Sequence, residues 1–228
     1  MDALIGCCRA LAITVVCSTL LGFDRSVVDP TVHQLTPYAA KANLAWSELP
    51  LIDANGRPFR LKDFRGKVLV IDFFFSSCPG ICPLQTAGLA KTWAKIPEWA
   101  SNSIVFVSLT IDPQHDDAQH LSAYQQRFGI DSPSWIFATG SQANIASVSA
   151  YFGSLLPKRA PTEHKAQIYL MGPRGQLLMN YPSAPLDSER LSRELGEAVE
   201  AFIPETAPVP PVETLLIPGP DVNAANRP

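Results

Sequence analysis

The sequence carries little charge, and it has no excess of positive charge. Asp, Glu, Lys and Arg make up 17% of the 228 residues, and the formal net charge is −3 at pH 7. Typical globular domains contain about 25% of these residues. A protein that binds nucleic acid generally carries a basic stripe or patch, so this composition argues against nucleic acid as a partner.

Cysteine is also sparse, and its distribution along the chain is uneven. The chain has five cysteines, which are too few for a dense disulfide scaffold. Cys7, Cys8 and Cys17 lie within the first 23 residues, and only Cys78 and Cys82 remain in the rest of the chain. The sequence therefore predicts a domain whose cysteine chemistry is gathered in one short segment, rather than a fold cross-linked by disulfides.

The two ends of the chain differ from the part between them. An uncharged apolar run at 10–23 is shorter than the roughly 20 residues of an ordinary span, so 1–23 is predicted to be a signal peptide or a single membrane anchor. Such a segment predicts that the protein is exported to the bacterial periplasm or to the periplasmic face of the inner membrane. Residues 204–228 are rich in proline and are predicted to be a disordered tail. Residues 24–203 then form one domain.

Strand and helix patterns alternate along this domain. Nearly continuous apolar runs at 67–75 and 103–110 are typical of strands buried on both faces. Further strands are predicted at 51–56, 59–61, 134–138, 166–171 and 176–181, and helices at 83–99, 116–128, 141–152 and 186–202. This order predicts an α/β fold with a mixed central sheet flanked by helices.

The two remaining cysteines stand between a predicted strand and a predicted helix, in the segment Cys-Pro-Gly-Ile-Cys-Pro at 78–83. Proline disfavours helical backbone in the residue before it, and it suits the first position of a helix. We therefore expect Cys82 to cap the helix and Pro83 to begin it. The free N–H groups of a helix N-terminus favour a thiolate over a thiol.

Three interpretations of this cysteine pair stay open on the residues alone: buried structural cysteines, a reversible disulfide, and a metal site. A metal site needs a third ligand, and His164 precedes a strand that could end beside the cysteine loop. His33 lies near the predicted prefix, and His115 and His120 are expected to face solvent. Two cysteines and one histidine suit Cu(I), and Cu(II) with a further ligand, whereas structural zinc requires four protein ligands.

Three acidic residues are candidates for supporting roles. Asp112 or Glu163 could orient the histidine or complete a metal shell, although solvated surface carboxylates are the simpler interpretation. Asp72 lies six residues before Cys78 on a predicted buried strand. Burial would raise the pKa of Asp72, and the carboxyl could then relay a proton to a departing thiolate. A structural aspartate bonded to a neighbouring loop is the alternative.

Three segments together resemble the Sco/SenC family: IDFFFSSCPGICP at 71–83, FVSLTIDPQHD at 106–116 and TEHKAQIYLMGPRG at 162–175. The resemblance covers about 44–202. It implies a thioredoxin-like fold and an exported or membrane-tethered protein that binds copper through Cys78, Cys82 and His164. The sequence departs from the family pattern at Gly80, where an acidic residue is usual, and at 117–118, where Asp-Ala replaces Thr-Pro.

The resemblance also implies a function. Proteins of this family deliver copper to the dinuclear copper site of cytochrome c oxidase, or reduce the cysteines of that site beforehand. We therefore expect a copper metallochaperone whose partner is a cuproprotein, such as a subunit of cytochrome c oxidase. The alternative is a thiol–disulfide oxidoreductase that uses Cys78 and Cys82 as its redox pair. A peroxiredoxin-like peroxidase is disfavoured because no arginine stands near these cysteines in the sequence.

Overall fold

The structure is a computed structural model that describes residues 44–154, 166–203, 212 and 216. The chain divides into two compact units, and all the described residues belong to the second, which spans Thr36–Pro228. The predictions made for 1–23, for Glu163 and His164, and for most of 204–228 lie outside the described residues. Among the helices that the structure describes, none combines the length and the apolar character that a membrane span requires.

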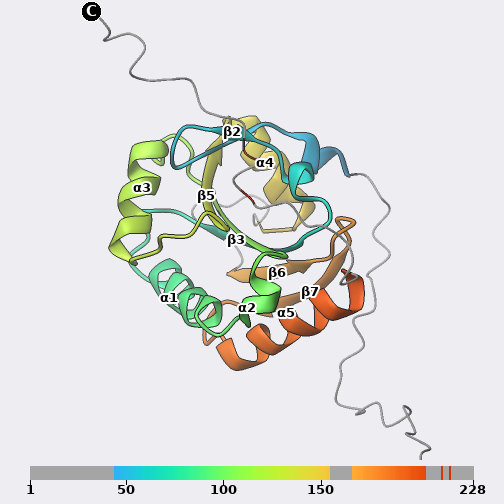
Figure 1. Cartoon of the computed structure of the whole chain (residues 1–228). Coiled ribbons are helices and arrows are strands. Elements are labelled where there is room, and N and C mark those ends of the chain that lie inside the picture. Colours follow the sequence, from blue (N-terminus) through green and yellow to red (C-terminus); the bar gives the residue numbers. More distant parts are fainter. Residues whose placement is uncertain (1–43, 155–165, 204–211, 213–215, 217–228) are drawn as a thin grey trace, which may run out of the picture. The chain divides into compact units, whose positions relative to one another are not determined.

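A seven-stranded mixed sheet forms the centre of the fold (Figure 1), in the order β2-β1-β5-β4-β3-β6-β7. Strands β3, β4 and β5 run parallel, and the remaining pairs are antiparallel. The strands are β1 (Leu51–Asp53), β2 (Pro58–Phe59), β3 (Val68–Phe74), β4 (Ile104–Thr110), β5 (Trp135–Gly140), β6 (Gln167–Met171) and β7 (Leu177–Pro182). The predicted mixed sheet is confirmed.

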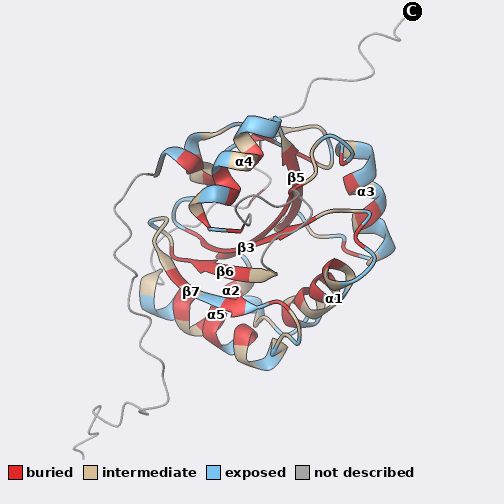
Figure 2. Ribbon diagram, turned by 180° about the vertical axis from the view of Figure 1, so that it is seen from behind, coloured by how far each residue is buried: buried red, intermediate tan, exposed pale blue. Residues whose placement is uncertain are grey.

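Helices flank this sheet, as the sequence predicted. They are η1 (Leu44–Glu48), η2 (Leu61–Phe64), α1 (Ile81–Trp93), α2 (Glu98–Ser101), α3 (Ala118–Arg127), α4 (Gln142–Tyr151) and α5 (Ser188–Phe202). Figure 1 shows α4 on one side of the sheet and α1, α2 and α5 on the other. Figure 2 shows that the strands between these layers are mostly buried.

Each central strand presents alternate side chains to the two faces, because successive residues of a strand point in opposite directions. On one face, Phe73 packs against Phe152, directly after α4. On the other, Phe74 packs against Tyr124 of α3, and Phe106 packs against Trp93 of α1. All seven residues of β3 and all seven of β4 are buried, so the sequence prediction of two-sided burial is confirmed.

The predicted helix over 83–99 differs from the structure at both ends. Helix α1 begins at Ile81 with Gly80 as its N-cap, so the prediction that Cys82 caps the helix is wrong. Pro83 is tolerated in the first turn because the N–H groups there have no partner within the helix. At the other end, Pro97 caps the separate helix α2, because proline cannot continue an α-helix through its interior.

Two residues of the segment predicted to be a disordered tail are part of the packed domain. The exposed fractions of Val212 and Leu216 are 1% and 5%, and both belong to the hydrophobic cluster on the α4 side of the sheet. Burial of large aliphatic side chains is favourable. The proline-rich composition of 204–228 therefore gave no indication that two of its apolar residues pack against the core.

Candidate functional site

Cys78 and Cys82 lie where β3 passes into α1, at the carboxyl end of the central parallel strands. Both are free thiols. Cys82 is fully buried in the first turn of α1, whereas Cys78 retains 9% of its surface in the loop before the helix. The backbone N–H of Cys78 donates to the carbonyl of Phe75 at 3.1 Å, which closes the turn that leads out of the strand.

The two thiols differ in their affinity for protons. Burial acts to raise the pKa of Cys78, but hydrogen bonds from the Cys82 thiol and from the backbone of Cys82, Gly80 and Ile81 outweigh it and lower this pKa below the usual value. Burial raises the pKa of Cys82 strongly, and its bond to Cys78 adds to that effect. Cys78 therefore gives up its proton more readily than Cys82, and the two sulfurs lie within hydrogen-bonding reach of each other.

Asp72 occupies the sheet beneath this turn and is 1% exposed. Burial raises its pKa to about 6, against bonds from Ser108 and Gln85 that lower it. Ser108 Oγ donates to Asp72 Oδ1 and Gln85 Nε2 donates to Asp72 Oδ2, both at 2.7 Å. Trp135 Nε1 donates in turn to Ser108 Oγ at 3.0 Å. Asp72 is thus a hydrogen-bonded carboxylate whose charge also acts to raise the pKa of Cys82.

Two polar residues near the cysteines have no role in the sequence analysis. Gln85 joins the first turns of α1 to Asp72. Asp116 is buried at 1% exposure and accepts hydrogen bonds from Ser76, two residues before Cys78. These contacts join residues that are 13 and 40 positions apart in the chain. Both contacts depend on which segments the tertiary structure brings together. The only sequence signal for them is therefore the predicted position of the strands.

The other predicted site residues that the structure describes have partners other than the two cysteines. Asp112 is hydrogen-bonded to His115 Nδ1 at 2.9 Å, and this bond is the main cause that raises the pKa of His115. The His115 and His120 side chains are 75% and 60% exposed, so the prediction that both face solvent is confirmed. Within the described residues, no group of three or more His, Cys, Asp and Glu side chains could hold a metal ion.

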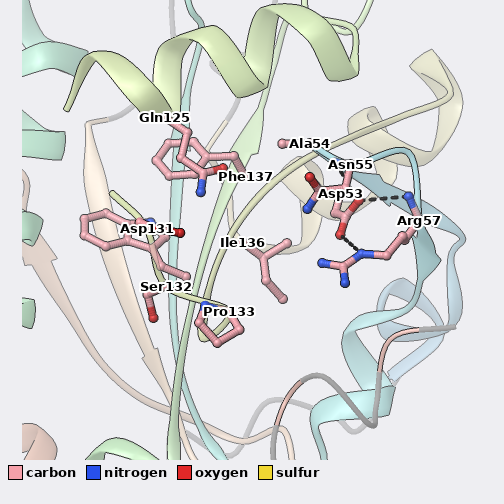
Figure 3. A pocket seen from close by; sticks show the side chains of 11 residues that line it. Asp53, Ala54, Asn55, Arg57, Gln125, Asp131, Ser132, Pro133, Ile136 and Phe137 are labelled. Carbon is pink, nitrogen blue, oxygen red and sulfur yellow. Dashed lines mark hydrogen bonds and ion pairs between the residues drawn. The ribbon is translucent and has the colours of Figure 1, made fainter. Parts of the chain in front are cut away.

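A separate pocket lies between the turn after β1 and the start of β5 (Figure 3), and its volume is about 320 Å³. Arg57 lines it and forms an ion pair with the buried Asp53, with 2.7 Å between Nε and Oδ2. Asp131 and Ile136 form part of the opposite wall. The pocket is lined by neither cysteine, so the thiol chemistry belongs to the loop before α1 and not to this cavity.

The sheet, the flanking helices and a cysteine pair at the junction of a strand and a helix define a thioredoxin-like protein. Comparison with known families makes this more specific, because residues 38–200 match the family model described as SCO1/SenC. The match spans well over half of the chain. The chain belongs to the SCO1/SenC family.

Solved structures agree with this assignment. The SCO1/SenC family lipoprotein from Bacillus anthracis is 31% identical, with a TM-score of 0.60 over 67% of this chain and 93% of that one. Arabidopsis thaliana ScoI, solved with copper bound, is 28% identical, with a TM-score of 0.58 over 68% and 97%. BsSco, a member of the Sco family of cytochrome c oxidase assembly proteins in which a disulfide switch has been identified, shares the fold at 24% identity, with a TM-score of 0.58 over 67% and 91%.

Proposed function

We propose that this protein is a copper metallochaperone that holds Cu(I) through Cys78, Cys82 and His164. The observation that carries this proposal is the pair of adjacent free thiols at the start of α1. Hydrogen bonds lower the pKa of one of them, Cys78. Thiolates and imidazole are soft and intermediate donors that suit Cu(I). Copper bound to the Arabidopsis relative supports the same cargo for this chain.

The two cysteines are placed to release copper as well as to hold it. Cys78 is at the surface end of the pair, and Cys82 is covered. An incoming thiolate of a partner could therefore replace Cys78 before Cys82, so that copper moves by exchange of one sulfur ligand at a time. Of the remaining candidates, Glu163 stands next to His164 in the sequence, where it could orient the imidazole, whereas Asp112 is already paired with His115.

The recipient in this proposal is a cuproprotein, with a copper-bearing subunit of cytochrome c oxidase as the specific candidate. Support comes from family membership and from BsSco, which belongs to the Sco family of oxidase assembly proteins. We also propose that residues 1–23 export or tether a domain that begins at about residue 24. The relative from Bacillus anthracis is a lipoprotein, which supports a location outside the cytoplasm, such as the periplasmic face of the inner membrane.

The second candidate function is reduction of disulfides by Cys78 and Cys82. A Cys78 thiol whose pKa is lowered, beside a Cys82 thiol whose pKa is raised, is the pattern of an attacking and a resolving thiol. Asp72 is buried under the pair and its pKa is raised to about 6, so it could accept the proton that Cys82 must release. This chemistry does not require His164.

Two variants separate the two functions. Copper(I) would be added anaerobically to the parent chain and to the Cys78→Ser and His164→Ala variants, and retention would be measured against a chromophoric chelator. Reduction of a small aromatic disulfide would be measured on the same samples. Metal delivery predicts weaker copper retention in both variants. Copper retention equal to that of the parent in both, together with loss of reductase activity in Cys78→Ser alone, would instead establish the redox function.

A further inference from the structure

A buried carboxylate from a different part of the chain fixes the start of the cysteine loop. The backbone N–H of Ser76 donates to Oδ2 of Asp116 at 3.0 Å, and the Ser76 hydroxyl donates to Oδ1 of the same carboxylate. Thr110 Oγ1, at the end of β4, donates to Oδ2 at 2.5 Å. Three donors therefore converge on Asp116, which is 1% exposed, and they tie the loop after β3 to the end of the neighbouring strand.

The residue beside Ser76 contacts both cysteines. The carbonyl of Phe75 accepts the backbone N–H of Cys78 at 3.1 Å. The backbone of Phe75 is also hydrogen-bonded to the sulfur of Cys82. Because the Phe75 carbonyl and the Ser76 N–H belong to one rigid peptide unit, the carboxylate that holds the Ser76 amide restrains the carbonyl to which Cys78 donates. The group that bonds to Cys82 is the N–H on the other side of the Phe75 Cα, so it is restrained through that one residue.

We propose that Asp116 is a positioning residue that sets the separation and orientation of the two sulfur atoms. It contacts neither cysteine, and it acts through the peptide unit between Phe75 and Ser76. The inference rests on the proposed function only in taking Cys78 and Cys82 as the working groups. Asp116 is the last residue of the segment 112–116, and none of the proposed copper ligands lies in that segment. The inference gives this residue a function.

The chemistry of the contact explains why a carboxylate is needed. An ionised carboxylate is an acceptor on both oxygens, and here its two oxygens receive three donors. Asparagine has one acceptor oxygen, and its amide N–H₂ would face donors on the other side. Asp116→Asn therefore leaves at least one buried donor unpaired while it preserves the volume of the side chain.

The test measures the equilibrium between the dithiol and the disulfide of Cys78 and Cys82 in the full chain, in dithiothreitol redox buffers without copper. The contacts of Asp116 stabilise the loop in the arrangement that it has here, with both cysteines as free thiols. A loosened loop loses part of that stabilisation, which favours the disulfide. We expect Asp116→Asn to shift the equilibrium constant toward the disulfide by about fivefold, or about 20 mV for a two-electron couple.

Two control variants distinguish positioning from general destabilisation. Glu194→Gln removes another buried carboxylate, which pairs with Tyr181 and Arg190 and stands far from the cysteines in the sequence. Asp112→Asn changes a carboxylate in the same loop that bonds to the exposed His115. Both should leave the equilibrium constant within twofold of the parent. Ser76→Ala, which keeps the amide donor and removes the hydroxyl donor, should shift it in the same direction by a smaller factor.

Each result of these measurements either supports or overturns the inference. A shift in Asp116→Asn and Ser76→Ala without a shift in the two controls supports the inference. An unchanged equilibrium in Asp116→Asn, or an equal shift in Glu194→Gln, overturns it. If Asp116→Asn does not fold, Ser76→Ala takes its place: a shift in that variant supports the inference, and an unchanged equilibrium overturns it. Because no copper is present, the outcome stands even if the copper proposal fails.

Discussion

The side-chain amide of Gln85 donates a hydrogen bond of 2.7 Å to the buried carboxylate of Asp72, and Gln85 lies three residues after Cys82. The same amide also donates to the carbonyl of Phe73 at 3.1 Å. The N-terminal part of α1 is thus tied to β3 by hydrogen bonds to Asp72 and Phe73, beneath the cysteine pair. The state of Asp72 therefore affects both the stability of the fold and the thiol that lies above it.

Asp72 makes the stability of the protein depend on pH. Its pKa is raised from 3.8 to about 6 in the folded state, mainly by burial. Between these two values the folded chain holds a proton that the unfolded chain has released, so the free energy of unfolding falls as the pH rises through this window. The shift corresponds to ~3 kcal/mol. Asp72→Asn should remove this part of the pH dependence.

Urea unfolding of the parent and of Asp72→Asn at several values between pH 4 and pH 7, followed by far-UV circular dichroism, measures this effect. The difference between the two proteins cancels the contributions of other groups. Gln85 Oε1 is buried and has no hydrogen-bond partner among the residues that the structure describes, so it could accept a hydrogen bond from the new amide if the Gln85 side-chain amide turns over. Parallel stability curves for the two proteins across this range would show that Asp72 does not titrate within it.

The two cysteines should react at very different rates. In Cys82→Ser, Cys78 keeps the backbone bonds that lower its pKa, and a serine hydroxyl can replace the Cys82 thiol as donor. In Cys78→Ser, Cys82 stays buried with a raised pKa. Because the thiolate is the reactive form, iodoacetamide at pH 7 should alkylate Cys82→Ser at least about tenfold faster than Cys78→Ser. Mass spectrometry follows both reactions, and equal rates would contradict the assignment of Cys78 as the attacking thiol.

The apolar residues near the C-terminus should contribute to stability. Leu216→Ala removes a side chain that is 5% exposed within the main hydrophobic cluster, and such a change typically costs about 2–4 kcal/mol. Leu84→Ala is a matched control because the same substitution is made at a residue that is 64% exposed. That control should stay within about 0.5 kcal/mol of the parent. Denaturant unfolding that gives equal losses for both variants would exclude packing of Leu216 as a stabilising contact.

The cap of α3 gives a local test of the loop that follows β4. The Asp117 side chain accepts the backbone N–H of His120 at 2.9 Å and caps the helix. Asp117→Ala should lower the free energy of unfolding by about 1 kcal/mol. Asp131→Ala, which changes an exposed aspartate after the same helix, should have a smaller effect. Thermal unfolding of both variants checks this, and the expectation fails if Asp131→Ala is the more damaging change.

The central strands and the cysteine site could be predicted because their signals are local. The apolar runs at 67–75 and 103–110 lie on β3 and β4, and the Asn-Gly turn between β1 and β2 follows from glycine at position 56, where φ is +76°. The start of α1 could not be fixed, because proline is acceptable at several positions of a first turn.

The contacts that hold the site together required the tertiary structure. Asp116 could be read as one more surface carboxylate until β3 and β4 lay side by side, with Phe74 opposite Thr110. Arg127 illustrates the same limit. No arginine is near the cysteines in the sequence, yet Arg127 Nη2 lies 3.5 Å from the carbonyl of Ser76. Separation along the sequence therefore did not predict which charged side chains lie near the cysteine loop.

X-ray absorption at the copper edge of the Cu(I)-loaded full chain tests the central claim most directly. The proposed ligands predict two sulfur atoms and one nitrogen atom around copper in the parent. His164→Ala should lose the nitrogen contribution and keep both sulfurs, whereas His115→Ala, which removes an exposed histidine, should leave the spectrum unchanged. A parent spectrum without two sulfur ligands, or one that is the same in His164→Ala, would contradict the account.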